Sequence, residues 1–157
     1  QDLKMLLKTF EVKKEWVDYN NHMNMAYYIL IFDQALEVAL EKFNMGSTAA
    51  KTIQRSTMVV ETNTKYLNEV KQGAMVDIHL SYFDHDNKRL HIKMEMIERD
   101  INKLSATIEW ISLYINLSKR KVTEFEEDKI ELMNKFIEQN KSNFTKDQLM
   151  FSSKLKK

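Results

Sequence analysis

The segment from Asp18 to Asn24 holds the side chains of this sequence that are best suited to chemistry. It offers a carboxylate, an imidazole and several amides, and it directly precedes a predicted helix. A helix N-terminus presents unpaired N–H groups and a partial positive charge, which can polarise a carbonyl oxygen as negative charge develops on it. Asp18 could then activate water as a general base or attack the carbonyl as a nucleophile. Asn20 and His22 could hold the water, the carboxylate or the leaving group.

The same residue types also suit a loop that carries no chemistry. Asn and Asp are common in connections between strands and helices, because their side chains form hydrogen bonds with nearby backbone groups. From the residue types alone, a catalytic loop and an ordinary turn both stay open as interpretations.

Changes in hydrophobic period predict the elements on either side of this loop. Apolar and polar residues alternate from Thr9 to Val17, which predicts a first strand. From Met25 to Phe43, apolar residues recur every three or four positions. This period predicts a long amphipathic helix, with Asn24 as its N-cap and Gly46 closing its end.

After this helix, four segments show the alternation of half-buried strands, and short polar turns separate them. They predict an antiparallel meander with one apolar face. In the last segment the alternation changes parity after Trp110, which predicts a bulge or burial on both faces. The predicted strands lie near residues 57–70, 76–82, 90–96 and 104–117.

The end of the chain reads as a helix followed by a tail. Thr123 and Glu126 have the spacing of a capping box, which predicts a C-terminal helix. Residues 141–157 are rich in Lys, Ser and Asn. We expect a single domain over residues 1–140 and a basic, partly disordered tail over 141–157.

The order of the elements predicts an α+β fold. A long apolar helix and a sheet with one apolar face are both buried when the sheet curls around the helix. We therefore expect a hot-dog fold, with a five-stranded antiparallel sheet wrapped round one long helix, plus a C-terminal helix. The edges of such a small sheet stay exposed, and pairing them across a two-fold axis favours a homodimer or a dimer of dimers.

Composition narrows the classes of function. The 157 residues include 24 Lys and Arg against 23 Asp and Glu, a net charge of +1, which argues against nucleic-acid or membrane-surface partners. The absence of Cys excludes disulfides, thiolate nucleophiles and Cys-type zinc sites. No apolar run approaches the ~18 residues of a membrane span, and no signal peptide is apparent. We expect a cytoplasmic protein, and the first residue, Gln1, leaves open whether it is one domain of a fused enzyme.

The histidines do not form a metal-binding pattern. His79 and His91 fall on the polar face of predicted strands, and His85 lies in a predicted turn. No two of them have the spacing that places a pair of ligands on one face of a helix. We therefore expect no metal site.

The loop and its surroundings resemble hot-dog-fold thioesterases of the 4-hydroxybenzoyl-CoA thioesterase type. The motif that carries this resemblance is Asp18-x-Asn20-x-His22-Met23-Asn24-x-x-x-Tyr28, and its Asp-x-Asn-x-His part is also similar to the catalytic set of acyl-carrier-protein thioesterases. More narrowly, the segments 16–28, 60–73 and 84–91 resemble betainyl-CoA thioesterases of carnitine breakdown, and the similarity spans about residues 12–130. One departure is Asn21, where the family has Gly, but Asn is the other residue that best tolerates a left-handed backbone.

This resemblance implies hydrolysis of an acyl-CoA to a carboxylate and free CoA, with no metal and no redox cofactor. It implies that Asp18 is the catalytic carboxylate, as base or nucleophile, and that Asn20 and His22 are its partners. The backbone amides from Asn24 to Tyr28 would polarise the thioester carbonyl, at a site that the family builds on its dimer interface. Medium-chain or aromatic acyl-CoA substrates stay open, as does a non-catalytic acyl-CoA-binding module, although the intact catalytic set speaks against that module.

Further residues are candidates for binding the substrate. Aromatic side chains could form a cage for a trimethylammonium group, with ordinary packing as the alternative. Glu61 could reach the site of a partner subunit and supply a second carboxylate for a cationic acyl group, or it could be a solvated strand residue. Lys88 and Arg89, at a hairpin tip, could hold the CoA phosphates or form a charged turn. The candidate cage residues are Trp16, Tyr19, Tyr27, Tyr28 and Trp110, and the predicted substrate-binding set is Trp16, Asn24, Tyr27, Tyr28, Glu61 and Trp110.

Overall fold

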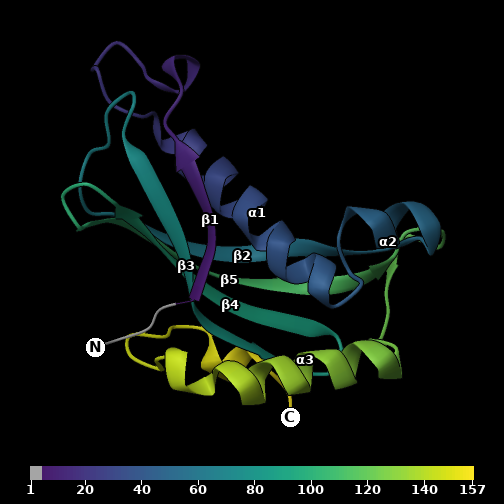
Figure 1. The fold of residues 1–157 in the computed structure, drawn as a ribbon. Helices are drawn as coiled ribbons and strands as arrows, with labels where there is room; N and C mark the ends of the chain where they lie inside the picture. Colours follow the sequence, from purple (N-terminus) through teal and green to yellow (C-terminus); the bar gives the residue numbers. More distant parts are fainter. Residues whose placement is uncertain (1–4) are drawn as a thin grey trace.

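The computed structural model describes residues 5–157 and shows a strongly curved antiparallel sheet around one long helix (Figure 1). The strands are β1 (Met5–Glu11), β2 (Arg55–Tyr66), β3 (Met75–His85), β4 (Arg89–Glu98), β5 (Lys103–Asn116) and β6 (Lys121–Val122). Their order in the sheet is β1-β3-β4-β5-β2, and the short β6 pairs with β5. The predicted five-stranded sheet wrapped round a long helix is confirmed, with β6 as a small addition.

Helix α1 (Met25–Lys42) forms the centre of the core. Its period buries one face completely, with Ile31, Phe32, Ala35 and Ala39 at 0% exposure. This face packs on the concave side of the sheet. Asn24 caps the helix as predicted, because its side chain accepts a hydrogen bond from the N–H of Ala26.

The end of α1 differs from the prediction. Asn44, not Gly46, adopts the left-handed conformation that ends the helix, with φ of 58°. Gly46 instead precedes the short helix α2 (Ser47–Thr52) as its N-cap. A side chain at Gly46 would collide with the carboxylates of Glu37 and Glu41. These carboxylates accept hydrogen bonds from the first backbone N–H groups of α2.

The first strand lies earlier in the chain than predicted. Instead of the expected span from Thr9 to Val17, β1 ends at Glu11, and residues Lys14–Trp16 form a 3₁₀ turn, η1. Hydrogen bonds between Val12 and the turn before β3 hold the chain where it leaves the sheet. The turn buries Trp16 against Tyr27, with ring centroids 5.9 Å apart. Trp16 is therefore buried by this contact and not as part of the predicted strand.

Strand β2 is an edge strand whose alternation is interrupted. A bulge between Val59 and Glu61 shifts its register against β5, so the apolar residues before and after it do not share one face. This bulge lies in β2, opposite the parity change in β5, and not in β5 where a bulge was one of the two predicted explanations. Strand β5 itself is buried on both faces. Met58 and Val60 are about half exposed, at 48% and 53%.

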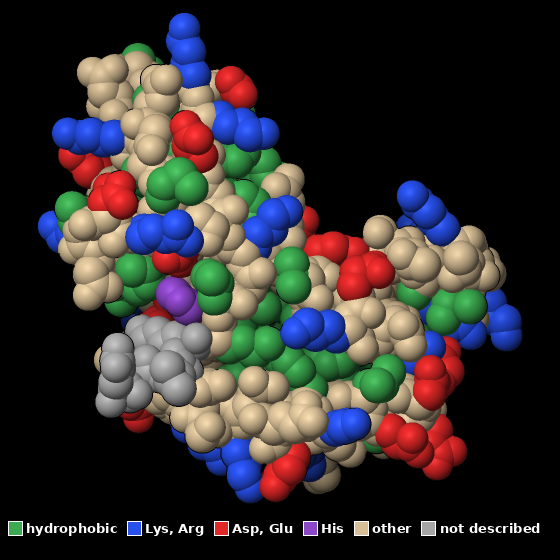
Figure 2. Space-filling model, in the orientation of Figure 1, with side chains coloured by type: hydrophobic (Ala, Val, Ile, Leu, Met, Phe, Trp, Pro, Cys, Tyr) green, Lys and Arg blue, Asp and Glu red, His purple; other side chains and the backbone are tan. Residues whose placement is uncertain are grey.

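The C-terminal helix α3 (Glu127–Asn140) closes one end of the core. Phe136 packs against Phe43 and Phe83, with ring centroids 5.0 and 5.5 Å apart. Hydrophobic side chains remain visible in the hollow between α1 and α3 (Figure 2). The predicted capping box is not formed, because the Glu126 carboxylate accepts hydrogen bonds from Tyr114 and Arg55 instead.

The segment after α3 lies against the outer face of the sheet, which is the convex face away from α1. Its 3₁₀ turns are η2 (Lys141–Asn143) and η3 (Ser152–Lys154). The N–H of Thr145 donates to the carbonyl of Ser81, and Phe151 is 5% exposed. The domain boundary at residue 140 stays a prediction. Residues 141–157, which were expected to form a partly disordered tail, are bound to the sheet as a strap.

Among the described residues, no helix has the length and apolarity to cross a membrane.

Candidate active site

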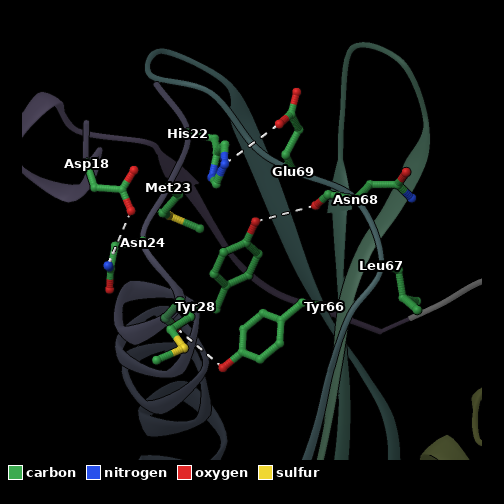
Figure 3. Close-up of a pocket in the computed structure, with 10 residues that line it drawn as sticks. Asp18, His22, Met23, Asn24, Tyr28, Tyr66, Leu67, Asn68 and Glu69 are labelled. Carbon is green, nitrogen blue, oxygen red and sulfur yellow. Dashed lines mark hydrogen bonds and ion pairs between the residues drawn. The ribbon is translucent and has the colours of Figure 1, made fainter. Parts of the chain in front are cut away.

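A pocket of about 410 Å³ lies where the loop before α1 meets the chain that follows β2 (Figure 3). It brings together Asp18, His22, Asn24 and Tyr28, which were predicted, with residues that were not. Its lining residues are Asp18, His22, Met23, Asn24, Met25, Tyr28, Tyr66, Leu67, Asn68 and Glu69.

Backbone hydrogen bonds fold the segment before α1 into a tight loop. The Asp18 N–H donates to the His22 carbonyl at 3.2 Å, and the Asn21 N–H donates to the Asp18 carbonyl at 3.0 Å. Asn21 adopts the left-handed conformation with φ of 64°. The loop therefore keeps the geometry that Gly would allow, because Asn tolerates this conformation better than other side chains.

The carboxylate of Asp18 lies beside the N-terminus of α1. Its Oδ1 accepts a hydrogen bond from the Asn20 N–H at 2.9 Å, and its Oδ2 accepts one from Asn24 Nδ2 at 3.4 Å. Asn24 thus caps the helix with its oxygen and contacts Asp18 with its nitrogen. The Asp18 carboxylate and the positive end of the helix are held together in this way.

His22 lies at the rim of the pocket and faces Glu69. The distance between His22 Nε2 and Glu69 Oε2 is 3.9 Å, and 35% of the His22 side chain is exposed. Asn20 behaves differently, because it contacts Asp18 through its backbone N–H and its side chain is not among the lining residues. The catalytic set of Asp18, Asn20 and His22 stays a prediction, and the structure places two of its side chains in the pocket.

Two tyrosines form the apolar wall of the pocket. Tyr28 and Tyr66 meet edge to face, with ring centroids 5.1 Å apart. The Tyr28 hydroxyl donates to the carbonyl of Asn68 at 3.4 Å. Burial, assisted by the charge of Glu69, raises the pKa of the Tyr28 hydroxyl above its ordinary value. At neutral pH the Tyr28 hydroxyl is therefore protonated and can donate this hydrogen bond.

The opposite wall is the segment 67–69, which β5 holds in place. The N–H groups of Leu67 and Asn68 both donate to the carbonyl of Ser105, at 2.9 and 3.1 Å. The Asn68 side chain donates to the carbonyl of Leu104 at 2.8 Å. Sequence reasoning missed Tyr66 and this whole segment as site residues. The signal that could have found them is their place in the segment 60–73, the second segment that resembles betainyl-CoA thioesterases.

The structure does not assemble the predicted aromatic cage within one chain. Trp16 stacks on Tyr27 outside the lining of the pocket. Tyr19 is 93% exposed, while Trp110 is buried in the core below α1. Of the five candidate cage residues, only Tyr28 lines the pocket.

Glu61 does not reach the pocket of its own chain. It points to the outer face of the sheet, where Lys154 of the strap lies 3.5 Å from its carboxylate. Tyr66 is five positions further along β2, so alternation places the two side chains on opposite faces. Tyr66 is the β2 residue that faces α1.

Lys88 and Arg89 lie at the far end of the sheet from the pocket. Asp86 holds the hairpin that carries them by accepting both backbone N–H groups and the Arg89 guanidinium. The pocket lies near the other end of β4, which is roughly 30 Å away at about 3.4 Å per residue. Within one chain, these residues therefore do not meet the pocket.

The residues that the structure describes contain no cluster of three or more His, Asp or Glu side chains placed to hold a metal ion. The chemistry available in the pocket is that of a carboxylate, an imidazole and the dipole of a helix. These groups can polarise a carbonyl, activate water and move a proton.

Comparisons with known proteins agree with this chemistry. A family model described as the thioesterase-like superfamily matches residues 12–137. The chain is 31% identical over 126 residues to the betainyl-CoA thioesterase of Pseudomonas aeruginosa, and the match covers 79% of each protein. It is also 28% identical over 115 residues to the L-carnitine dehydrogenase/betainyl-CoA thioesterase of Agrobacterium fabrum. That match covers 73% of this chain and only 23% of the longer protein.

Solved structures show the same fold. A hypothetical protein of Staphylococcus aureus, solved in complex with CoA, aligns over 100% of this chain and 97% of its own, with a TM-score of 0.80 and 24% identity. The superfamily match runs through the whole pocket, from the loop at Asp18 to Glu69. This chain therefore belongs to the thioesterase-like superfamily and is a thioester hydrolase with the hot-dog fold.

Proposed function

We propose that this acyl-CoA thioester hydrolase acts on a short acyl-CoA, with betainyl-CoA as its first substrate, and that Asp18 is its catalytic carboxylate. The observation that carries the proposal is the position of the Asp18 carboxylate beside the N-terminus of α1 in the pocket. The named activity of the Pseudomonas aeruginosa relative supports the choice of betainyl-CoA. Medium-chain and aromatic acyl-CoA esters are the alternative substrates, and a non-catalytic acyl-CoA-binding module is the alternative function.

The reaction needs one water and no oxidant. The thioester carbonyl oxygen points at the first amides of α1, which stabilise the negative charge of the tetrahedral intermediate. Asp18 accepts a proton from water as the water oxygen attacks the carbonyl carbon. The C–S bond then breaks, and the proton passes to the departing CoA thiolate. As a nucleophile, Asp18 would instead form an acyl anhydride and release the thiolate, and water would then hydrolyse the anhydride.

His22 and Asn20 support Asp18 in different ways. His22, at the rim, can carry the proton toward the leaving sulfur, because an imidazole can both accept and donate a proton. Asn20 holds the carboxylate through its backbone N–H. The reaction uses CoA as part of the substrate and needs no metal or redox cofactor. We place it in the cytoplasm, with no nucleic-acid or membrane partner.

The exposed edge strand supports a homodimer, or a dimer of dimers built from it. β2 has a neighbour on one side only, and apolar side chains along it and at the mouth of the pocket are exposed. Met25 is 68% exposed, Val60 53% and Leu67 48%. Pairing of β2 with its copy would cover these side chains at the pocket mouth. Light scattering on the native protein is expected to give twice or four times the mass of the chain.

The experiment that tests the function is thiol release from betainyl-, acetyl-, hexanoyl-, palmitoyl- and 4-hydroxybenzoyl-CoA. Asp18→Asn should lower kcat by at least about a hundredfold, since general acid–base catalysis contributes 10²–10⁴. It should still bind the CoA ester, because only the basicity of the side chain is lost. The control is Asp147→Asn, an exposed carboxylate of the strap. Normal turnover in Asp18→Asn would remove Asp18 from its role, and tight binding with no release from any ester would favour the binding module.

A further inference from the structure

The pocket carries negative charge and no compensating cation. Its lining includes two carboxylates, Asp18 and Glu69, and among the described residues that line it there is no Lys or Arg. An anionic acyl group would meet repulsion there, while a cationic group would be attracted. The charge of the site therefore discriminates between acyl groups.

The two carboxylates lie apart from each other in the pocket, one on each side of Tyr28 (Figure 3). Asp18 is engaged with Asn24 beside the helix N-terminus, where the thioester carbonyl is polarised. Among the described hydrogen bonds and ion pairs, Glu69 has no contact with that helix end, and its contact is with His22, whose Nε2 lies 3.9 Å from Glu69 Oε2. Glu69 is thus free to interact with a part of the substrate other than the carbonyl.

The backbone that carries Glu69 is fixed from both sides. On one side the N–H of Asn68 donates to the carbonyl of Ser105 at 3.1 Å, and on the other the N–H of Met23 donates to the carbonyl of Val70 at 2.6 Å. The second bond ties the Glu69 segment directly to the loop that carries Asp18. The backbone at Glu69 therefore keeps a constant place relative to the loop that carries Asp18, while its side chain is 59% exposed.

The tyrosine pair supplies the second element that a quaternary ammonium needs. Ring faces attract such a cation by about 0.5–2 kcal/mol. Tyr28 and Tyr66 meet at a right angle, with an interplanar angle of 90°. Tyr28 is 4% exposed and Tyr66 is 46% exposed, so the ring surface open to a ligand is mainly that of Tyr66. The rings and Glu69 line the same pocket.

We propose that Glu69 is a specificity-determining residue, which selects a cationic acyl group by acting as its counter-ion next to Tyr28 and Tyr66. This inference rests on the proposed function, since it assigns the selectivity of the same site. The two carboxylates then have different roles, because Asp18 acts on the carbonyl and Glu69 binds the quaternary ammonium. Glu61, the carboxylate favoured by the sequence, has no part in it within one chain.

The test compares betainyl-CoA with 3,3-dimethylbutyryl-CoA, in which carbon replaces the quaternary nitrogen at nearly the same size. Wild-type protein should prefer the cationic ester in kcat/KM. Glu69→Gln should reduce that preference by about tenfold, because kcat/KM should fall much more for the cationic ester than for the neutral one. Glu69→Lys should reduce it further, because it reverses the charge. Added salt should weaken the wild-type preference and have little effect on that of Glu69→Gln.

The matched control is Glu131→Gln, an exposed carboxylate on α3, which should change neither ester. If Glu69→Gln slows both esters equally, Glu69 orients His22 instead, and the inference is overturned. If wild-type protein shows no preference for the cation but hydrolyses the neutral ester, the inference fails while the thioesterase function stands. If wild-type protein hydrolyses neither ester nor any other ester of the panel, the proposed function fails.

Discussion

Glu109 and His91 form a buried pair on the outer face of the sheet, with Glu109 Oε2 2.6 Å from His91 Nε2 and both side chains 1% exposed. The same carboxylate accepts hydrogen bonds from the backbone N–H groups of Met150 and Phe151, at 2.8 and 2.9 Å. These bonds connect adjacent strands β4 and β5 to the C-terminal strap. One side chain of the sheet therefore holds the end of the chain in place.

We expect Glu109→Gln to destabilise the fold by about 2–3 kcal/mol, because hydrogen bonds to charged groups are worth 1.5–3 kcal/mol each and several are weakened together. Chemical denaturation at pH 7 measures this difference. Glu124→Gln, an exposed carboxylate before α3, is the control and should unfold like wild type. An unchanged unfolding midpoint in Glu109→Gln would show that the strap is held by other contacts.

The same pair predicts how stability depends on pH. Burial opposes ionisation of Glu109, but the hydrogen bonds from His91 and from the two strap N–H groups outweigh it and lower its pKa below the ordinary value. A lowered pKa adds stability that is fully present above the pKa of the unfolded chain, about 4.3, and is lost as pH falls through the folded pKa. The stability gap between wild type and Glu109→Gln should therefore be constant from pH 7 to about 5 and shrink below about 4.3. A gap that grows toward acid pH would contradict this assignment.

Asn24 links the helix cap to the Asp18 carboxylate, and a substitution can separate these two contacts. Asn24→Asp keeps an oxygen for the Ala26 N–H, so the cap and the melting temperature should be retained. It also replaces the contact between Asn24 Nδ2 and Asp18 Oδ2 with repulsion between two carboxylates. We expect kcat/KM to fall by about tenfold or more, the effect of about 1.4 kcal/mol. Asn24→Ser keeps the cap without adding charge, so it should lose less kcat/KM than Asn24→Asp. Equal losses of kcat/KM in both variants would exclude charge repulsion as the cause.

Asn21 supports the geometry of the Asp18 loop through its positive φ. Asn21→Ala should destabilise the protein by about 1 kcal/mol and lower kcat, because a Cβ-bearing side chain without an amide resists the left-handed conformation. Asn21→Gly should retain both stability and turnover, since Gly adopts this conformation without steric cost. Urea denaturation and thiol release on the two variants measure these effects. Equal behaviour of Ala and Gly would show that the loop does not depend on this conformation.

The sequence by itself determined the parts of this protein that depend on local order. The three- and four-residue period of α1, the alternation of the strands and the cap at Asn24 are properties of neighbouring residues, so they could be predicted without a partner. The Asp18 loop could be found for the same reason, because its carboxylate and the helix that faces it are adjacent in the chain. Local patterns failed where a tertiary contact was stronger, as at Trp16, which turns out of the strand to pack on Tyr27.

Only the tertiary structure decided which distant residues complete the site. Tyr66 and Glu69 reach the pocket because the sheet curls and β5 holds the segment after β2, and no spacing near Asp18 encodes that curvature. The bulge in β2 interrupts the expected alternation between Val59 and Glu61, and it depends on the pairing of β2 with β5. The strap follows the same rule, since Glu109 and Phe151 meet across 42 positions of the chain. Short-range periodicity specifies elements, whereas sites and buried charge pairs depend on contacts that form only when those elements pack.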